Sequence, residues 1–212
     1  MHTLKPHRFL AVILLFALAA LPGCTGTPAQ PAETPSDRSW ATIAFDFQKQ
    51  SGHASNQFAV WVETADGQYV KTLYATKFTA AGGYKNRPDS IPTWVDRSGL
   101  AGLSKEQVDV MAGATPKSGA QSYTWDLTGA DGAPVPAGTY KFFVEGSLRW
   151  KNRVLHAGEI AIGGEAATAT ATAAFTYETS PDQPALSDDS PEHDMIGTVT
   201  AGVHAVTVPH RA

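Results

Sequence analysis

The sequence predicts an all-β fold, an antiparallel β-sandwich with one short helix and a long loop, over residues 40–178. Apolar and polar residues alternate there with period two, and turn-forming residues interrupt the alternation at short intervals. About seven strands with little helix are typical of a sandwich.

The alternating segments are those of half-buried strands. In the first, Ile43, Phe45 and Phe47 share one face, and Asp66-Gly67 supplies a hairpin turn between the second and the third. The expected strands are residues 43–47, 58–62, 69–78, 122–127, 140–146, 154–162 and 166–177.

Residues 81–103 break the alternation and predict the long loop, because they combine a glycine pair, two prolines and several charges. The short helix is expected over residues 105–111. Ser104 and Gln107 stand three apart as a capping box, and Gly113 and Pro116 follow as stop signals.

Residues 179–212 begin as an acidic, proline-rich stretch, which predicts a tail outside the sandwich. Within it, residues 195–208 are apolar enough for one late strand.

Residues 1–23 have the parts of a secretory signal peptide. Two basic residues, Lys5 and Arg8, precede an apolar run over residues 9–20, which is shorter than the roughly 20 residues of a membrane-spanning helix. The next four residues, Leu21-Pro22-Gly23-Cys24, resemble the lipobox of bacterial lipoproteins. The resemblance implies that Cys24 is acylated, becomes the first residue of the mature chain and anchors it to a membrane.

Cys24 is the only cysteine of the chain, so a disulfide cannot account for it. The alternative is an ordinary cleaved signal with an incidental cysteine. Thr25 stands where aspartate would signal inner-membrane retention, which favours the outer membrane if the source is Gram-negative. Residues 24–39 are rich in proline and threonine and predict a disordered tether.

The net charge is −4 and the basic residues are dispersed, which argues against a nucleic-acid partner. The histidines lack the spacing of metal ligands, and no catalytic triad, P-loop or dinucleotide motif is recognisable. A conventional hydrolase or kinase is therefore not expected.

Residues 65–73 and 125–140 resemble the immunoglobulin-like domain of flagellar hook-assembly capping proteins. Trp125 is expected to pack inward, Asp131-Gly132 to form a turn, and Tyr140 to begin the next strand. The resemblance implies an immunoglobulin-like sandwich but no function, because one fold hosts many functions.

The segment after the predicted helix resembles the acceptor site for covalent flavin attachment. In that pattern an aspartate precedes Ser or Thr, Gly, Ala and a final Ser or Thr, which bonds to the phosphate of FMN. Asp109, Gly113, Ala114 and Thr115 match it, whereas Ala112 stands where the pattern has a hydroxyl residue. The alternative is a helix stop built from small residues.

A wider resemblance covers most of residues 40–177. Residues 56–63, 71–78, 82–88 and 91–94 are similar to a family of predicted periplasmic proteins of unknown function. Its members are often encoded near PepSY-domain membrane proteins and flavin transferases. The resemblance implies electron transfer outside the cytoplasm, with a FAD:protein FMN transferase and a PepSY-type membrane redox protein as partners.

Residues of the predicted loop are candidates for contacts with such a flavin. Tyr84 and Trp94 could flank its ring, and Arg87 could meet its phosphate, with Lys85 and Arg97 as alternatives to Arg87. The alternative is that the aromatic side chains pin the loop to the sandwich and the cation is solvated.

The leading hypothesis is a lipid-anchored redox carrier with FMN on Thr115, more a carrier or binding module than a catalyst. One alternative is a non-redox binding or assembly module that presents residues 81–103 to another protein. An extracytoplasmic metal-handling protein is a third reading, which rests only on scattered histidines.

Overall fold

The computed structural model describes residues 39–52, 55–179, 185–187 and 189–205. The predicted signal peptide, the lipidation site Cys24 and all but the last residue of the predicted tether lie outside the described residues.

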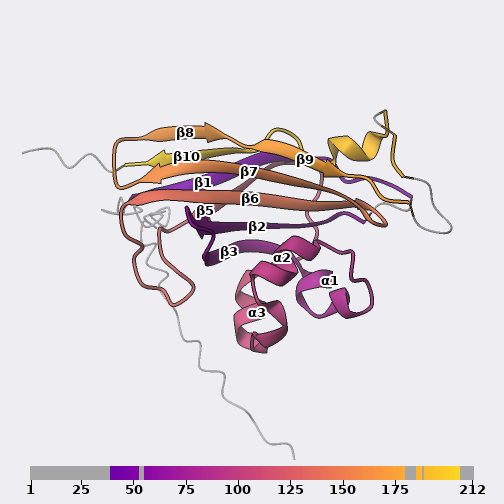
Figure 1. The fold of residues 1–212 in the computed structure, drawn as a ribbon, viewed down its shortest axis with the longest axis horizontal. Coiled ribbons are helices and arrows are strands. Elements are labelled where there is room, and N and C mark those ends of the chain that lie inside the picture. The colour runs from indigo at the N-terminus through magenta and orange to yellow at the C-terminus, as the bar shows by residue number, and fades with distance from the viewer. Residues whose placement is uncertain (1–38, 53–54, 180–184, 188, 206–212) are drawn as a thin grey trace, which may run out of the picture. The chain divides into compact units, whose positions relative to one another are not determined.

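Two β-sheets form the domain (Figure 1), and the predicted all-β sandwich is confirmed. One sheet has the strand order β5 (Gly119–Trp125), β1 (Trp40–Phe47), β10 (Thr200–His204), β8 (Ala167–Thr170). The other has the order β4 (Ala112–Gly113), β3 (Tyr69–Thr76), β2 (Gln57–Thr64), β6 (Gly138–Arg149), β7 (Asn152–Ile162), β9 (Thr172–Thr176). Neighbouring strands are antiparallel except for β3 and β4.

The core between the sheets is built from every second residue of the strands, as the alternation predicts. Phe45 and Phe47 of β1 contact Phe58 of β2, with ring centroids 5.5 and 5.1 Å apart. Trp125 is also buried, as predicted, and packs edge-on against Tyr140 at 5.2 Å. The aromatic rings therefore join the two sheets along much of the core.

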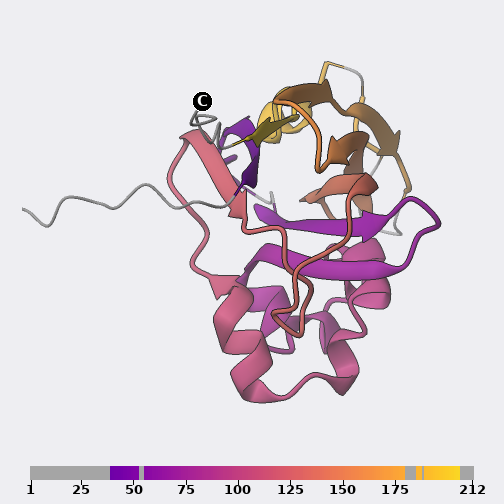
Figure 2. The same cartoon turned by 90° about the vertical axis from the view of Figure 1, so that its left-hand side faces the viewer.

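A layer of short helices covers part of the outer face of the six-stranded sheet (Figure 2). It consists of α1 (Lys77–Ala80), η1 (Gly83–Lys85), α2 (Pro92–Arg97), η2 (Leu100–Gly102) and α3 (Lys105–Met111). Ile91, Trp94 and Leu100 are buried against Trp61 and Phe143 of the sheet. Residues 81–103 thus form helical turns packed on the sheet, because their apolar residues are buried there.

Buried polar groups of β6 hold the start of α2 in place. The Glu145 carboxylate accepts hydrogen bonds from the backbone N–H groups of Thr93 and Trp94, at 3.1 and 2.8 Å. The Ser147 hydroxyl accepts one from the Ile91 N–H at 2.7 Å. These groups satisfy N–H donors that a helix start leaves without intrahelical partners.

The predicted helix over residues 105–111 is confirmed as α3, including its capping box. The Gln107 N–H donates to the Ser104 hydroxyl at 3.3 Å, and the Ser104 N–H donates to the Gln107 side chain at 2.8 Å.

The C-terminal part of the chain enters the sandwich. β10 lies between β1 and β8, and Met195, Val199 and Val203 are buried in the core. The sandwich therefore extends past the boundary expected at residue 178. The prediction of a single strand over 166–177 is wrong, because this segment divides at Ala171 into β8 and β9, which belong to different sheets.

Candidate functional site

The segment that resembles a flavin acceptor lies at the edge of the sandwich. After α3, Ala112 and Gly113 form β4 and pair in parallel with Ala75 and Thr76 at the end of β3. The chain then runs through residues 114–118 to β5, the edge strand of the other sheet (Figure 2). The Gly-Ala-Thr segment thus begins a short crossing between the two sheets.

Tyr74 of β3 fixes the backbone of this segment. A Cβ atom on Gly113 would lie 2.3 Å from Cε2 of the Tyr74 ring, so no larger residue fits without a shift. The Tyr74 hydroxyl donates a hydrogen bond to the carbonyl oxygen of Ala114 at 2.5 Å. Burial raises the pKa of Tyr74, which keeps the phenol protonated as a donor. Glycine at position 113 therefore has a packing reason in this fold.

Tyr74 packs against a group of aromatic rings in the core of the sandwich. Its ring lies 4.8 Å from Tyr123 and 5.2 Å from Phe58, and Tyr123 in turn stacks on Phe45 at 6.0 Å. Burial raises the pKa of Tyr123, and the electrostatic effect of the nearby Tyr74 raises it further. The Gly-Ala-Thr segment thus contacts the sandwich core through Tyr74, and this contact fixes the position of its backbone.

The Thr115 side chain is within reach of solvent. Thr115 is half-buried, Ala114 before it is exposed, and neither belongs to a helix or strand. Among the described residues, no hydrogen bond of its hydroxyl is found. No described residue therefore engages the Thr115 hydroxyl.

The other residues of the pattern surround the end of α3. Asp109 is exposed on α3 and forms an ion pair with Lys105 one turn earlier. Ala112 is half-buried in β4 opposite Ala75. Asp109 thus lies on α3, Gly113 in β4, and Ala114 and Thr115 on the segment that follows, and position 112 has no hydroxyl.

The three predicted loop contacts have different surroundings. Trp94 is fully buried, and its indole N–H donates to the Thr72 hydroxyl at 2.8 Å, so its ring pins the helical layer to the sheet. The half-buried Arg87 side chain donates to the Ser55 hydroxyl, and desolvation lowers the pKa of Arg87 despite nearby Asp89. Tyr84 is half-buried and lines a cavity beside α3. Of the three, Tyr84 is the one that lines this cavity.

A cavity of about 620 Å³ lies on the outer face of the six-stranded sheet. Its buried carboxylate, Glu63, accepts hydrogen bonds from the Trp61 indole at 2.7 Å and from Arg97 at 2.8 Å. Lys141 and Glu159 line the same cavity from paired positions of β6 and β7. The Glu63–Arg97 pair is visible only in the fold, because nothing in the local sequence pattern links residues 34 positions apart.

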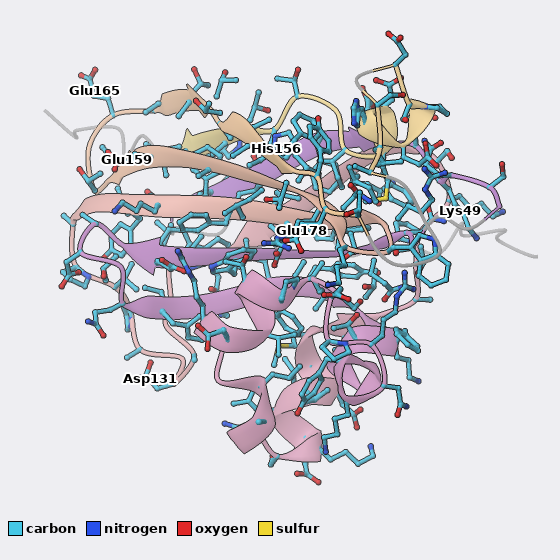
Figure 3. The ribbon with its side chains drawn as sticks, turned by 45° about the vertical axis from the view of Figure 1, so that its right-hand side comes forward. Lys49, Asp131, His156, Glu159, Glu165 and Glu178 are labelled. Carbon is cyan, nitrogen blue, oxygen red and sulfur yellow. The ribbon has the colours of Figure 1, made fainter. Side chains whose placement is uncertain are left out.

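His156 and Glu159 lie on opposite faces of β7, as their odd separation predicts (Figure 3). Glu159 is exposed at the outer cavity, whereas His156 is buried. Burial lowers the pKa of His156 to about 4. Its Nε2 atom has no hydrogen-bond partner among the described residues. A neutral imidazole inside the sandwich follows from these surroundings.

Within residues 39–52, 55–179, 185–187 and 189–205, no group of three or more His, Cys, Asp or Glu side chains could hold a metal ion. In the same described ranges, no helix has the length and apolar character needed to cross a membrane.

Comparison with known proteins identifies the domain at the level of a family. The model of the family described as "Predicted periplasmic protein (DUF2271)" matches residues 41–179. No curated protein and no solved structure matches the chain. The matched range covers β1 to β9 of the strands that the structure describes, the helical layer and the Gly-Ala-Thr segment, whereas β10 lies beyond it.

Proposed function

The chain belongs to the DUF2271 family of predicted periplasmic proteins, and on that premise we propose that it is a lipid-anchored redox carrier with FMN esterified to Thr115. Cys24 would carry the lipid, with the outer membrane as the site of attachment if the source is Gram-negative. The carrier would exchange electrons with a PepSY-type membrane protein.

The observation that supports this proposal most is the placement of the Thr115 hydroxyl. It lies on an irregular segment between β4 and β5, half-buried and without a hydrogen bond to the described residues. A threonine hydroxyl is a weak nucleophile, so a separate enzyme must reach and activate it. The exposed neighbour Ala114 has a small side chain, which leaves room for that approach.

The attachment reaction balances with FAD as the donor. The Thr115 Oγ1 atom would attack the FMN phosphorus of FAD, forming a phosphodiester bond. The pyrophosphate bond breaks, AMP leaves, and the hydroxyl proton is released to the base of the FAD:protein FMN transferase. The chain itself supplies the acceptor and its fixed position, while the bound flavin would supply the redox chemistry.

The alternative of a binding module that presents residues 81–103 has less support. Ile91, Trp94 and Leu100 of this segment are buried against the sheet rather than presented to a partner. The proposal does not require catalysis by the chain, which would act as a carrier.

The test is co-expression of the full chain with a FAD:protein FMN transferase. Intact mass should rise by one FMN, and the denatured band should fluoresce. Thr115→Val should abolish both signals, whereas Thr168→Val, on an exposed position of β8, should leave them unchanged. Ala112→Thr, which restores the hydroxyl of the pattern, should raise the modified fraction.

Two outcomes would contradict the proposal. The first is no increase in mass with any transferase, including in the Ala112→Thr variant. The second is a mass increase that Thr115→Val does not remove, which would place the modification elsewhere.

A further inference from the structure

Resting on the proposed function, we infer that the groove between α1 and α3 holds the isoalloxazine ring of the flavin that Thr115 carries. This groove, called the α3 groove below, has a volume of about 420 Å³. Its apolar floor includes Ala80, Leu100 and Leu103, its wall includes Tyr84, and lysines stand around it at positions 77, 85 and 105.

The α3 groove begins beside the attachment segment. Asp109, the first residue of the acceptor pattern, lines it from α3. Gly113 pairs with Thr76, and Lys77, which also lines the groove, follows Thr76 directly. The residues that line the groove are therefore direct neighbours of the strand pair at which the attachment segment begins, two residues before Thr115. The flexible ribityl chain of FMN would have to span the remaining path.

The apolar and aromatic residues that line the groove suit a planar isoalloxazine ring. Ala80 and Leu100 are buried, so the floor is apolar, and the half-buried Tyr84 supplies an aromatic side chain. The volume falls within the roughly 300–1,000 Å³ of typical small-molecule sites. An aromatic ring system gains from stacking on tyrosine beyond the apolar area it buries.

The charge of the groove also suits an attached FMN. Lys77, Lys85 and Lys105 line the groove with one carboxylate, Asp109, which Lys105 already pairs. This local positive excess contrasts with the chain's net charge of −4. The phosphodiester of an attached FMN is anionic, so lysines near its path would favour the flavin over a neutral ring.

The larger cavity on the outer face of the sheet is a poorer site for the ring. Its cations, Arg97 and Lys141, are accompanied by two carboxylates, Glu63 and Glu159, and Arg97 is already engaged by Glu63. It is lined from β2, β6, β7 and the end of α2, whereas the attachment segment leaves from β4 at the edge of the sheet. Lys141 therefore provides a matched control for the lysines of the α3 groove.

The first experiment uses the unmodified full chain and free flavins as probes. Titration should quench the fluorescence of FMN, and riboflavin should bind more weakly because it lacks the phosphate. Tyr84→Leu should weaken FMN binding about fivefold, the equivalent of about 1 kcal/mol for an aromatic contact. Lys77→Gln with Lys85→Gln should remove the preference for FMN, and Lys141→Gln should leave it unchanged. The inference is overturned if the wild-type chain quenches neither flavin, or if Lys141→Gln weakens binding as much as the groove variants.

The second experiment uses the modified chain and separates this inference from the proposed function. Flavin fluorescence per mole and quenching by iodide should both increase in Tyr84→Leu, with the mass increase at Thr115 retained. A retained mass increase with unchanged fluorescence and unchanged iodide quenching would overturn the groove assignment alone. No mass increase in any variant would retire the proposed function, and the titration with free flavins would then decide the groove by itself.

Discussion

The two faces of the six-stranded sheet are buried by different means. On the inner face of β2, Phe58, Val60 and Val62 meet the other sheet in an apolar core. On the outer face, beneath the helical layer, two of the fully buried side chains are carboxylates, Glu63 and Glu145. The inner layer needs only alternating apolar residues, whereas the outer layer depends on particular polar partners.

Both carboxylates are bonded to α2. Arg97 at its end donates to Glu63, and the N–H groups of Thr93 and Trp94 at its start donate to Glu145. A buried carboxylate without such donors costs several kcal/mol, so other positions of α2 are disfavoured. The polar anchors thus specify where the helical layer sits, while the inner core supplies most of the apolar burial.

The largest expected effect comes from the inner face. Phe58→Ala should lower the free energy of unfolding by about 3–5 kcal/mol, because it leaves a cavity between both sheets. Chemical denaturation measures this loss. Trp94→Ala is the matched change on the outer face, and it should expose the amides of α2 to hydrogen exchange while those of β1 stay protected. Equal loss of protection in β1 for both variants would show that the two layers unfold as one.

A smaller effect should follow from acid. His156 has a pKa of about 4 in the folded chain and an ordinary value of 6.5 when unfolded, so the unfolded state binds its proton more readily. Above pH 6.5 the histidine is neutral in both states and the fold has its full stability. As the pH falls toward 4, the free energy of unfolding decreases by about 2–3 kcal/mol. Denaturation at pH 7.5, 5 and 4 should show this slope in the wild type and a weaker one in His156→Leu. Substitution of the exposed His204 by leucine provides the control. An unchanged pH slope in His156→Leu would contradict the assignment of this slope to His156.

The smallest of these effects concerns the outer anchor. Glu145→Ala leaves the N–H groups of Thr93 and Trp94 without their acceptor, which should cost about 1–3 kcal/mol. Burial raises the pKa of Glu145, so its ionised form destabilises the fold as the pH rises through that pKa. Glu145→Gln should remove this dependence and keep one acceptor. Hydrogen exchange at Trp94 that is unchanged in Glu145→Ala would show that the carboxylate does not anchor α2.

The difference between the faces also explains what the sequence can predict. Alternation marks the inner face directly, so β1, β2, β6 and β7 follow from the pattern, and the capping box of α3 is a local signal. The helical layer lacks such a signal, because each of its helices is short and Ile91 before α2 adopts a left-handed backbone with φ of 43°. Its order comes from contacts with β6, more than 50 residues away in the chain.

The candidate site divides in the same way. The pattern from Asp109 to Thr115 is contiguous and therefore visible in the sequence. Tyr74, which requires glycine at position 113 and binds the Ala114 carbonyl, lies 40 residues before that carbonyl and is visible only in the fold. The α3 groove is likewise assembled from residues 77 to 109 and has no sequence motif.

The place of β10 bears on how the protein is made. β1 is flanked by β5 and β10, so its second neighbour is supplied by residues 200–204. A nascent chain that has not yet released this segment leaves one edge of β1 without its partner, and the four-stranded sheet cannot close. For a chain that crosses a membrane before it folds, the four-stranded sheet could then be completed only after residues 200–204 have been translocated.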